Sequence, residues 1–139
     1  MKQRIYIDTS VVGGYFDEEF RETTRLLFDR LVKSEIIFVV SDLLDLELLN
    51  APGNVRELLH NYSTDKVITL ADKYIFEKVV GHTSLEDCRH IALATINRVD
   101  VLASWNFKHI VNLDRIKGYN SVNLKSGYPM IEIRSPKDL

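Results

Sequence analysis

Three short apolar runs that do not alternate with polar residues constrain the fold of this chain more than any other feature. They are residues 5–7 (Ile-Tyr-Ile), 36–40 (Ile-Ile-Phe-Val-Val) and 101–103 (Val-Leu-Ala). A strand without a polar face is covered on both faces, as the strands of a parallel sheet are. The runs therefore predict a parallel sheet with helices packed over it.

Polar residues follow each of these runs at the point where the predicted strand ends. Asp8 follows the first run, Ser41 the second, and residues 104–106 (Ser-Trp-Asn) the third. Ligands of open α/β sheets bind in the crevice outside the carboxyl ends of the strands. Each polar residue alone is explained as the cap of the next helix. The joint pattern is not explained by capping, and it favours a functional site with Asp8 as its first acid.

Two further acids are candidates for the same site. Glu47 lies more than one turn inside a helix predicted to begin at Asp42, too far from its start for the helix dipole to explain a carboxylate there. A solvent-facing position is the alternative for Glu47. Asp87 lies in the first turn of a helix predicted to begin at Thr83, where the dipole alone also explains an acid.

Apolar spacing and glycine or proline punctuation predict the remaining elements. Helices are expected over residues 20–33, 55–62, 71–80 and 111–116, and Thr83 and Glu86 have the spacing of a capping box. Residues 66–70 and 129–134 are expected to be extended, the latter at a sheet edge, and residues 119–128 to be rich in loops. The pair Gly13-Gly14 is interpreted as a turn or a site of close packing.

Composition restricts the class of protein further. With 139 residues and 45% hydrophobic content, residues 1–139 are expected to form one globular domain. Eighteen basic and 20 acidic residues give a net charge of −2, which argues against a simple nucleic-acid binder but less against a nuclease that holds cations. The single cysteine, Cys88, excludes an intrachain disulfide. No long apolar run is present, so a cytoplasmic protein without membrane attachment is expected.

Four sequence features, in this order, resemble a PIN domain, the metal-dependent nuclease fold that includes toxins of many bacterial and archaeal toxin–antitoxin pairs. They are residues 6–10 (Tyr-Ile-Asp-Thr-Ser), Glu47, residues 87–92 (Asp-Cys-Arg-His-Ile-Ala) and residues 104–107 (Ser-Trp-Asn-Phe). The resemblance spans nearly the whole chain. It implies a three-layer α/β fold with a central, mainly parallel sheet flanked by helices.

The resemblance also implies a site and an activity. Its catalytic and metal-binding residues would be Asp8, Glu47, Asp87 and Asn106. Thr9 or Ser10 would assist in a metal-dependent endoribonuclease that leaves a 5′-phosphate. The oxygen ligands suit Mg²⁺ or Mn²⁺. The fourth position is often an acid in the family, so Asn106 is a departure that lowers the negative charge of the site. An RNA substrate, an antitoxin protein and a homodimer are the expected partners.

Contacts with the substrate and alternative functions remain open at this level. The candidates for phosphate contact are Lys108, His109, Arg21 and Arg25, each of which is equally well explained as solvated charge. Trp105 and Phe107 are candidates for base stacking or for core anchors. A PIN-like binding or regulatory module that acts through a protein partner is the main alternative. A phosphotransfer domain is a more distant one, because Asp8 lacks the neighbouring acids that such domains use.

Overall fold

A five-stranded, all-parallel sheet forms the centre of the molecule. The computed structural model describes residues 2–41, 56–59 and 64–139. The strands are β1 (Gln3–Ile7), β2 (Ile36–Ser41), β3 (Arg56–Leu59), β4 (Val101–Ala103) and β5 (Ile133–Arg134). They lie in the order β3-β2-β1-β4-β5, and each neighbouring pair is parallel. The three apolar runs are thus the three central strands of this sheet.

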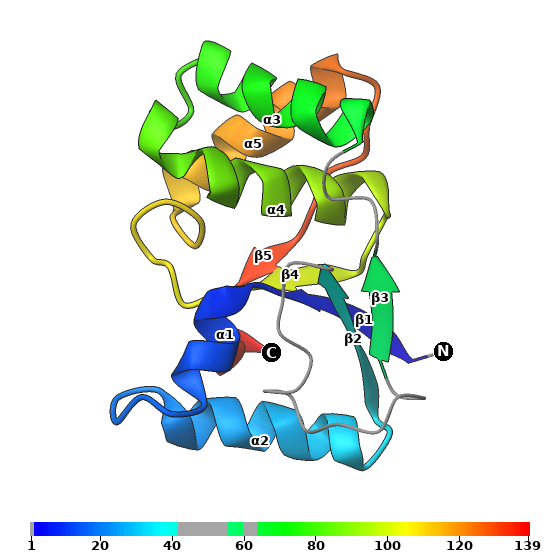
Figure 1. Cartoon of the computed structure of the whole chain (residues 1–139), viewed down its shortest axis with the longest axis vertical. Coiled ribbons are helices and arrows are strands. Elements are labelled where there is room, and N and C mark those ends of the chain that lie inside the picture. Colours follow the sequence, from blue (N-terminus) through cyan, green and yellow to red (C-terminus); the bar gives the residue numbers. More distant parts are fainter. Residues whose placement is uncertain (1, 42–55, 60–63) are drawn as a thin grey trace.

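Helices cover both faces of the sheet. They are α1 (Thr9–Gly14), α2 (Arg21–Val32), α3 (Asp65–Phe76), α4 (Leu85–Ile96) and α5 (Leu113–Lys125), with short 3₁₀ turns η3 (His82–Ser84) and η4 (Pro136–Asp138). Figure 1 shows α1 and α2 on one side of the sheet and α3, α4 and α5 on the other. The predicted three-layer α/β fold is confirmed. None of the helices in the described parts of the chain is long and apolar enough to cross a membrane.

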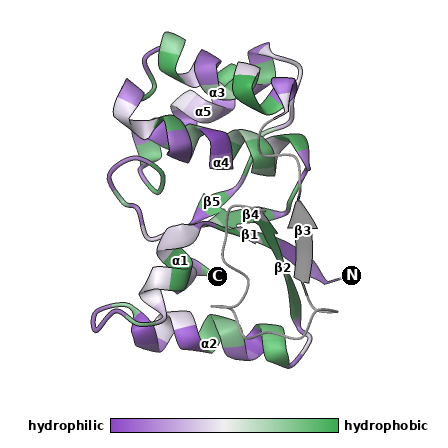
Figure 2. Ribbon diagram, in the orientation of Figure 1, coloured by the Kyte–Doolittle hydropathy of each residue, from purple (hydrophilic) through white to green (hydrophobic). Residues whose placement is uncertain are grey.

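The strands do not alternate between apolar and polar residues, because each face of the sheet packs into its own hydrophobic core. Ile5 and Ile7 of β1 pack with Leu27 and Leu31 of α2, whereas Tyr6 belongs to the core formed with α3, α4 and α5. Because successive side chains of a strand point to opposite faces, both faces of β1 need apolar residues. Each large apolar side chain buried in this way contributes about 1.5–3 kcal/mol. Figure 2 shows the hydrophobic residues concentrated along β2 and β4.

The register of the strands determines which polar residues meet. Ile7 of β1 pairs with Ala103 of β4, so the next residues, Asp8 and Ser104, leave the sheet side by side. Tyr6 pairs with Val39 of β2, and β2 ends nearby at Ser41. The sheet therefore brings the polar residues after β1 and β4 to one edge, as the sequence pattern predicted.

Several predicted elements were wrong in type or extent. Residues 56–59 form strand β3, paired with β2, instead of a helix over 55–62. Residues 66–70 are helical, because Val67, Leu70, Ala71 and Tyr74 form one buried helical stripe in α3. The β-branched residues of this segment had favoured an extended interpretation. The C-terminal segment pairs only over Ile133–Arg134, although it does lie at the sheet edge as predicted.

Two further corrections concern helix ends. Helix α5 continues to Lys125 through the segment predicted to be a loop, because Asn120 and Asn123 satisfy their amides in the buried interior. Helix α4 has Ser84 as its N-cap, without a capping hydrogen bond from a side chain. Thr83 lies instead within η3, so the predicted capping box is not formed.

Candidate acidic site at the carboxyl edge of the sheet

Asp8 is a buried acid whose carboxylate is held from three directions. Its side chain is 4% exposed and follows directly after β1. Oδ1 accepts a hydrogen bond of 2.6 Å from the Ser10 hydroxyl and one of 3.3 Å from the Val11 backbone N–H. Oδ2 accepts a hydrogen bond of 2.7 Å from the Ser104 hydroxyl. Asp8 therefore both caps α1 and presents a fixed carboxylate at the sheet edge, so the two interpretations of this residue are compatible.

Two serine hydroxyls join the turns that follow β1 and β4. The Ser10 oxygen lies 3.3 Å from that of Ser104 and accepts a hydrogen bond of 2.9 Å from the Trp105 backbone N–H. The Ser104 oxygen accepts a hydrogen bond of 3.0 Å from the Asn106 backbone N–H. Because the hydroxyls donate to Asp8 while accepting from the next turn, the position of the carboxylate depends on both strands.

Asn106 links the β4 turn to Asp87 of α4. Its amide nitrogen donates a hydrogen bond of 3.3 Å to Asp87 Oδ2. Its amide oxygen accepts hydrogen bonds from the backbone N–H groups of Lys108, at 3.2 Å, and His109, at 3.0 Å. These two donors establish which end of the amide is oxygen. The amide oxygen thus accepts hydrogen bonds within its own turn, and the amide nitrogen orients Asp87.

The electrostatics of Asp87 show that the two acids share one environment. Burial of the carboxyl raises the pKa of Asp87, and the negative charge of Asp8 raises this pKa further. The neighbouring Glu86 acts in the same direction, whereas His109 lowers the pKa. A carboxyl whose charge is disfavoured in this way favours a cation or a proton beside it.

A buried histidine and tyrosine lie beneath the acids. The Tyr6 hydroxyl and His90 Nδ1 are 2.6 Å apart, and both side chains are almost fully buried. Burial lowers the pKa of His90, while the negative charge of Asp8 raises it. A neutral His90 suits this position, because its ring packs into the core while one nitrogen pairs with the tyrosine.

The donor set of the site fits a hard cation. Among the described residues, one acceptor position on Asp8 Oδ2 and the whole of Asp87 Oδ1 have no hydrogen-bond donor. Mg²⁺ is usually held by one or two carboxylates together with substrate phosphates. Among the described residues, no group of three or more His, Cys, Asp or Glu side chains is placed to hold a metal. Glu47, the predicted third acid, lies outside the described residues.

The other predicted residues take different positions. Ser10 contacts Asp8 directly, whereas Thr9 is exposed at the start of α1. Lys108 is exposed, and His109 is partly buried, with its backbone carbonyl accepting a hydrogen bond of 2.6 Å from the Tyr119 hydroxyl. Asp8, Ser10, Asp87 and Asn106 are therefore brought together by the fold.

The two arginines predicted as phosphate contacts lie on α2. The Arg25 guanidinium stacks over the ring of Tyr15 at 4.8 Å and donates a hydrogen bond to its carbonyl oxygen. Arg21 is exposed in the first turn of the same helix. These contacts explain the position of Arg25 in the fold, and its contact with a phosphate stays a prediction.

Sequence reasoning did not assign a site role to Ser104 or to the pair Tyr6 and His90. Ser104 is fully buried and holds Asp8, and its position after β4 was the available signal. His90 stands three residues after Asp87, on the same side of α4, which was the signal for the histidine. Its hydrogen bond to Tyr6 joins two elements far apart in sequence, so it required the fold.

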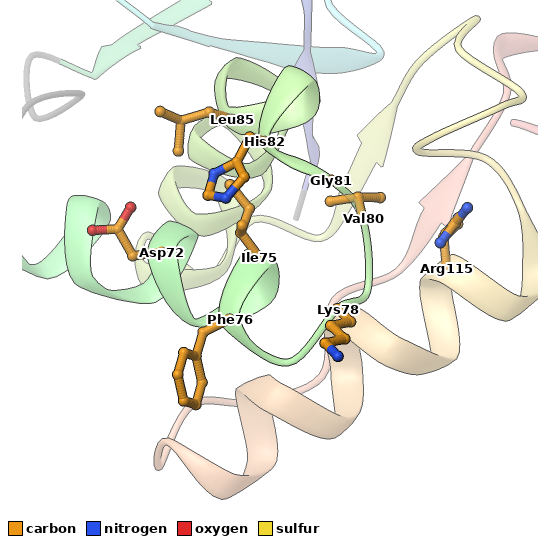
Figure 3. Close-up of a pocket in the computed structure, with 9 residues that line it drawn as sticks. All are labelled: Asp72, Ile75, Phe76, Lys78, Val80, Gly81, His82, Leu85 and Arg115. Atoms are coloured by element: carbon orange, nitrogen blue, oxygen red, sulfur yellow. The ribbon is translucent and has the colours of Figure 1, made fainter.

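A larger pocket lies away from these acids. Its volume is about 820 Å³, and Figure 3 shows residues of α3, α5 and the connection to α4 around it. Its lining includes the apolar residues Phe76, Val80 and Leu85 and the basic residues Lys78 and Arg115. Neither Asp8 nor Asp87 lines this pocket, so the pocket is separate from the acidic site.

No protein-family model matches this chain, and comparisons with curated proteins and with solved structures found no match.

Proposed function

We propose that this chain is a Mg²⁺- or Mn²⁺-dependent endoribonuclease of the PIN type. The observation that carries the proposal is the convergence of Asp8 and Asp87, which the fold brings together from the end of β1 and the start of α4. The influence of Asp8 on the pKa of Asp87 supports their proximity. The proposal extends to the role of a cytoplasmic toxin that is neutralised by an antitoxin protein and forms a homodimer, as the sequence resemblance implies.

The residues of the site divide the chemical task. Asp8 and Asp87 would hold the metal, with Glu47 as the third acid implied by the sequence. When bound, the metal supplies Lewis-acid polarisation of a phosphoryl oxygen and activation of water. The Ser10 and Ser104 hydroxyls fix the orientation of Asp8, and the Asn106 amide fixes that of Asp87. Such fixed ligands reduce the reorganisation required at the moment of reaction.

The test is cleavage of a 5′-labelled single-stranded RNA with Mn²⁺ or Mg²⁺ and with a chelator. Asp8→Asn and Asp87→Asn should each reduce the rate by roughly 100-fold or more, since even the outer hydrogen-bonding partners of metal ligands typically contribute about 10- to 100-fold. Asp29→Asn makes the same chemical change at an exposed residue of α2 and should leave the rate unchanged. Cleavage that persists in Asp8→Asn, or that ignores the chelator, would contradict the proposal.

A binding or regulatory module is the second candidate, and the Asn106 contacts favour it. The amide oxygen of Asn106 is occupied by two backbone N–H groups, so this side chain adds neither charge nor a free oxygen to the site. Isothermal titration with Mn²⁺ separates the candidates. An enzyme should show binding that Asp8→Asn removes, whereas a module without a competent metal site should show none.

A further inference from the structure

Three aromatic rings form a cluster immediately beside the acidic site. Phe20 stacks on Trp105 with ring centroids 4.2 Å apart and planes 18° from parallel. The Phe107 ring is tilted against both, with its centroid 6.0 Å from that of Trp105 and 6.4 Å from that of Phe20. Asn106, which contacts Asp87, lies between the two aromatic residues of the β4 turn.

Exposure separates the roles of these rings. Trp105 is only 8% exposed, and its indole N–H donates a hydrogen bond of 2.9 Å to the Thr24 hydroxyl. It is therefore a core anchor, which is one of the two roles predicted for it. Phe107 is 49% exposed, so about half of its surface is available to a ligand. Exposing a large apolar ring to water carries no stabilising benefit for the fold itself.

The turn that carries Phe107 is held on both sides. The Asn106 side chain binds the backbone N–H groups of Lys108 and His109, and the Asn106 carbonyl accepts a hydrogen bond of 2.8 Å from Val111. The rings of Phe20 and Trp105 contact the Phe107 ring in tilted orientations. A ring that is already fixed in this way loses little conformational freedom when a ligand covers it.

The position of Phe107 specifies what the ligand would be. Its Cα lies about 3.8 Å from that of Asn106, as for any adjacent residues, and Asn106 orients an acid proposed to act on a phosphate. Lys108, the next residue, is exposed and positively charged. The chain thus places an aromatic ring and a cation next to a site proposed for a phosphate. One nucleotide unit of a single strand has matching groups, because it carries a phosphate and a base that is free to stack.

We propose that Phe107 is a stacking subsite for one base of single-stranded RNA, next to the phosphate that a metal held by Asp8 and Asp87 would contact. The inference rests on the proposed nuclease function for the identity of its ligand. It adds a preference that the acids alone do not give, because a paired base must first leave its stack, at a cost in free energy, before it can cover Phe107. Single-stranded RNA should therefore be bound in preference to a duplex of the same length.

The test is binding of a fluorescein-labelled single-stranded RNA, an abasic strand of equal length and an RNA duplex, measured by anisotropy with Asp8→Asn as the background to prevent cleavage. Phe107→Ala should weaken binding of the single-stranded RNA by roughly 5- to 150-fold, the range expected for the loss of one base–aromatic contact. Binding of the abasic strand and the duplex should not change. Phe107→Tyr keeps the ring and should retain affinity.

Phe76→Ala is the matched control, because Phe76 is 84% exposed on α3 and lines the separate pocket of Figure 3. This control should leave all three affinities unchanged. The single tryptophan gives a second readout, since base binding at Phe107 should quench Trp105 fluorescence 6.0 Å away. Circular dichroism should show that both alanine variants remain folded.

The inference is overturned if Phe107→Ala binds single-stranded RNA as the background protein does, if it loses affinity equally for the abasic strand, or if RNA binds neither to the background protein nor to the chain with Asp8 intact in Ca²⁺, which also takes oxygen ligands. Its failure is distinguishable from failure of the proposed function. Metal-dependent cleavage with no effect of Phe107→Ala refutes the stacking subsite alone. If RNA binding depends on Phe107 and on the bases but the chain with Asp8 intact does not cleave RNA, only the proposed nuclease function is refuted.

Discussion

Gly14→Ala should destabilise the protein, because Gly14 leaves the space that Trp105 occupies. A Cβ built on Gly14 would lie 2.6 Å from Trp105 Nε1 and 2.9 Å from the Thr24 hydroxyl oxygen. Both atoms belong to the hydrogen bond that fixes the indole. The clash therefore acts on the anchor of the turn that carries Asn106 and Phe107.

The magnitude follows from three contributions. Overpacking a well-filled core typically costs about 1–3 kcal/mol, and loss of the indole hydrogen bond would add about 0.5–1.5 kcal/mol. Replacing glycine by alanine in a helix returns about 0.5–1 kcal/mol. We expect the free energy of unfolding of Gly14→Ala to fall by about 0.5–4 kcal/mol.

Gly13→Ala is the matched control for this substitution. Gly13 lies in the same helix, α1, but no atom lies within 4 Å of the added Cβ. The control should raise the free energy of unfolding by about 0.5–1 kcal/mol. Urea denaturation followed by far-UV circular dichroism gives both values, and Trp105 fluorescence reports whether the indole moves. Equal stability of the two variants would refute the packing argument.

Two further predictions concern ionisable groups. The folded-state pKa of Asp87 is raised by burial and by Asp8, so the free energy of unfolding of the wild-type protein should decline as the pH rises through the titration of Asp87. Asp87→Asn should lack this decline. Urea midpoints in the presence of chelator should therefore show that this variant is more stable than wild type at pH 7. A midpoint with the same pH dependence in both proteins would contradict this. Burial raises the pKa of Cys88 to about 12, so its thiol should react with an alkylating reagent at pH 9 only after urea unfolding, and the free energy of unfolding should fall as the pH rises above about 8.5, where an unfolded cysteine ionises. Rapid labelling of the native protein, followed by mass spectrometry, would count against it.

The central sheet was predictable because its signal is local. Residues 5–7, 36–40 and 101–103 each contain the apolar run that a doubly covered strand requires, and all three form strands. Strand β3 was missed because its assignment depends on pairing with β2, a partner remote in sequence. The predicted helix ended before the true end of α5, because asparagines such as Asn120 and Asn123 are locally typical of loops. In the structure their amides donate to groups outside α5.

The positions of Asp8 and Asp87 were predictable from the sequence, whereas their hydrogen bonds were not, and Glu47 stays a prediction. Asp8 follows a strand and Asp87 begins a helix, positions that sequence patterns reveal. The direction of the Asn106 amide could not be inferred, because it depends on backbone N–H groups of the following turn. From the sequence, Asn106 was predicted to bind the metal through its amide oxygen. In the structure that oxygen accepts hydrogen bonds from its own turn, and the amide nitrogen donates to Asp87. This arrangement favours a positioning role for Asn106.

The β4 turn connects stability, acid geometry and the proposed base contact in one segment. Ser104 holds Asp8, Asn106 holds Asp87, and Trp105 between them anchors the turn in the core. Phe107 follows directly and is supported by the same anchor. Movement of Trp105 should therefore disturb both the acids and the exposed ring, whereas substitution of Phe107 should leave the acids in place. The packing of one indole against Gly14 thus supports the turn that holds both Asp8 and Asp87.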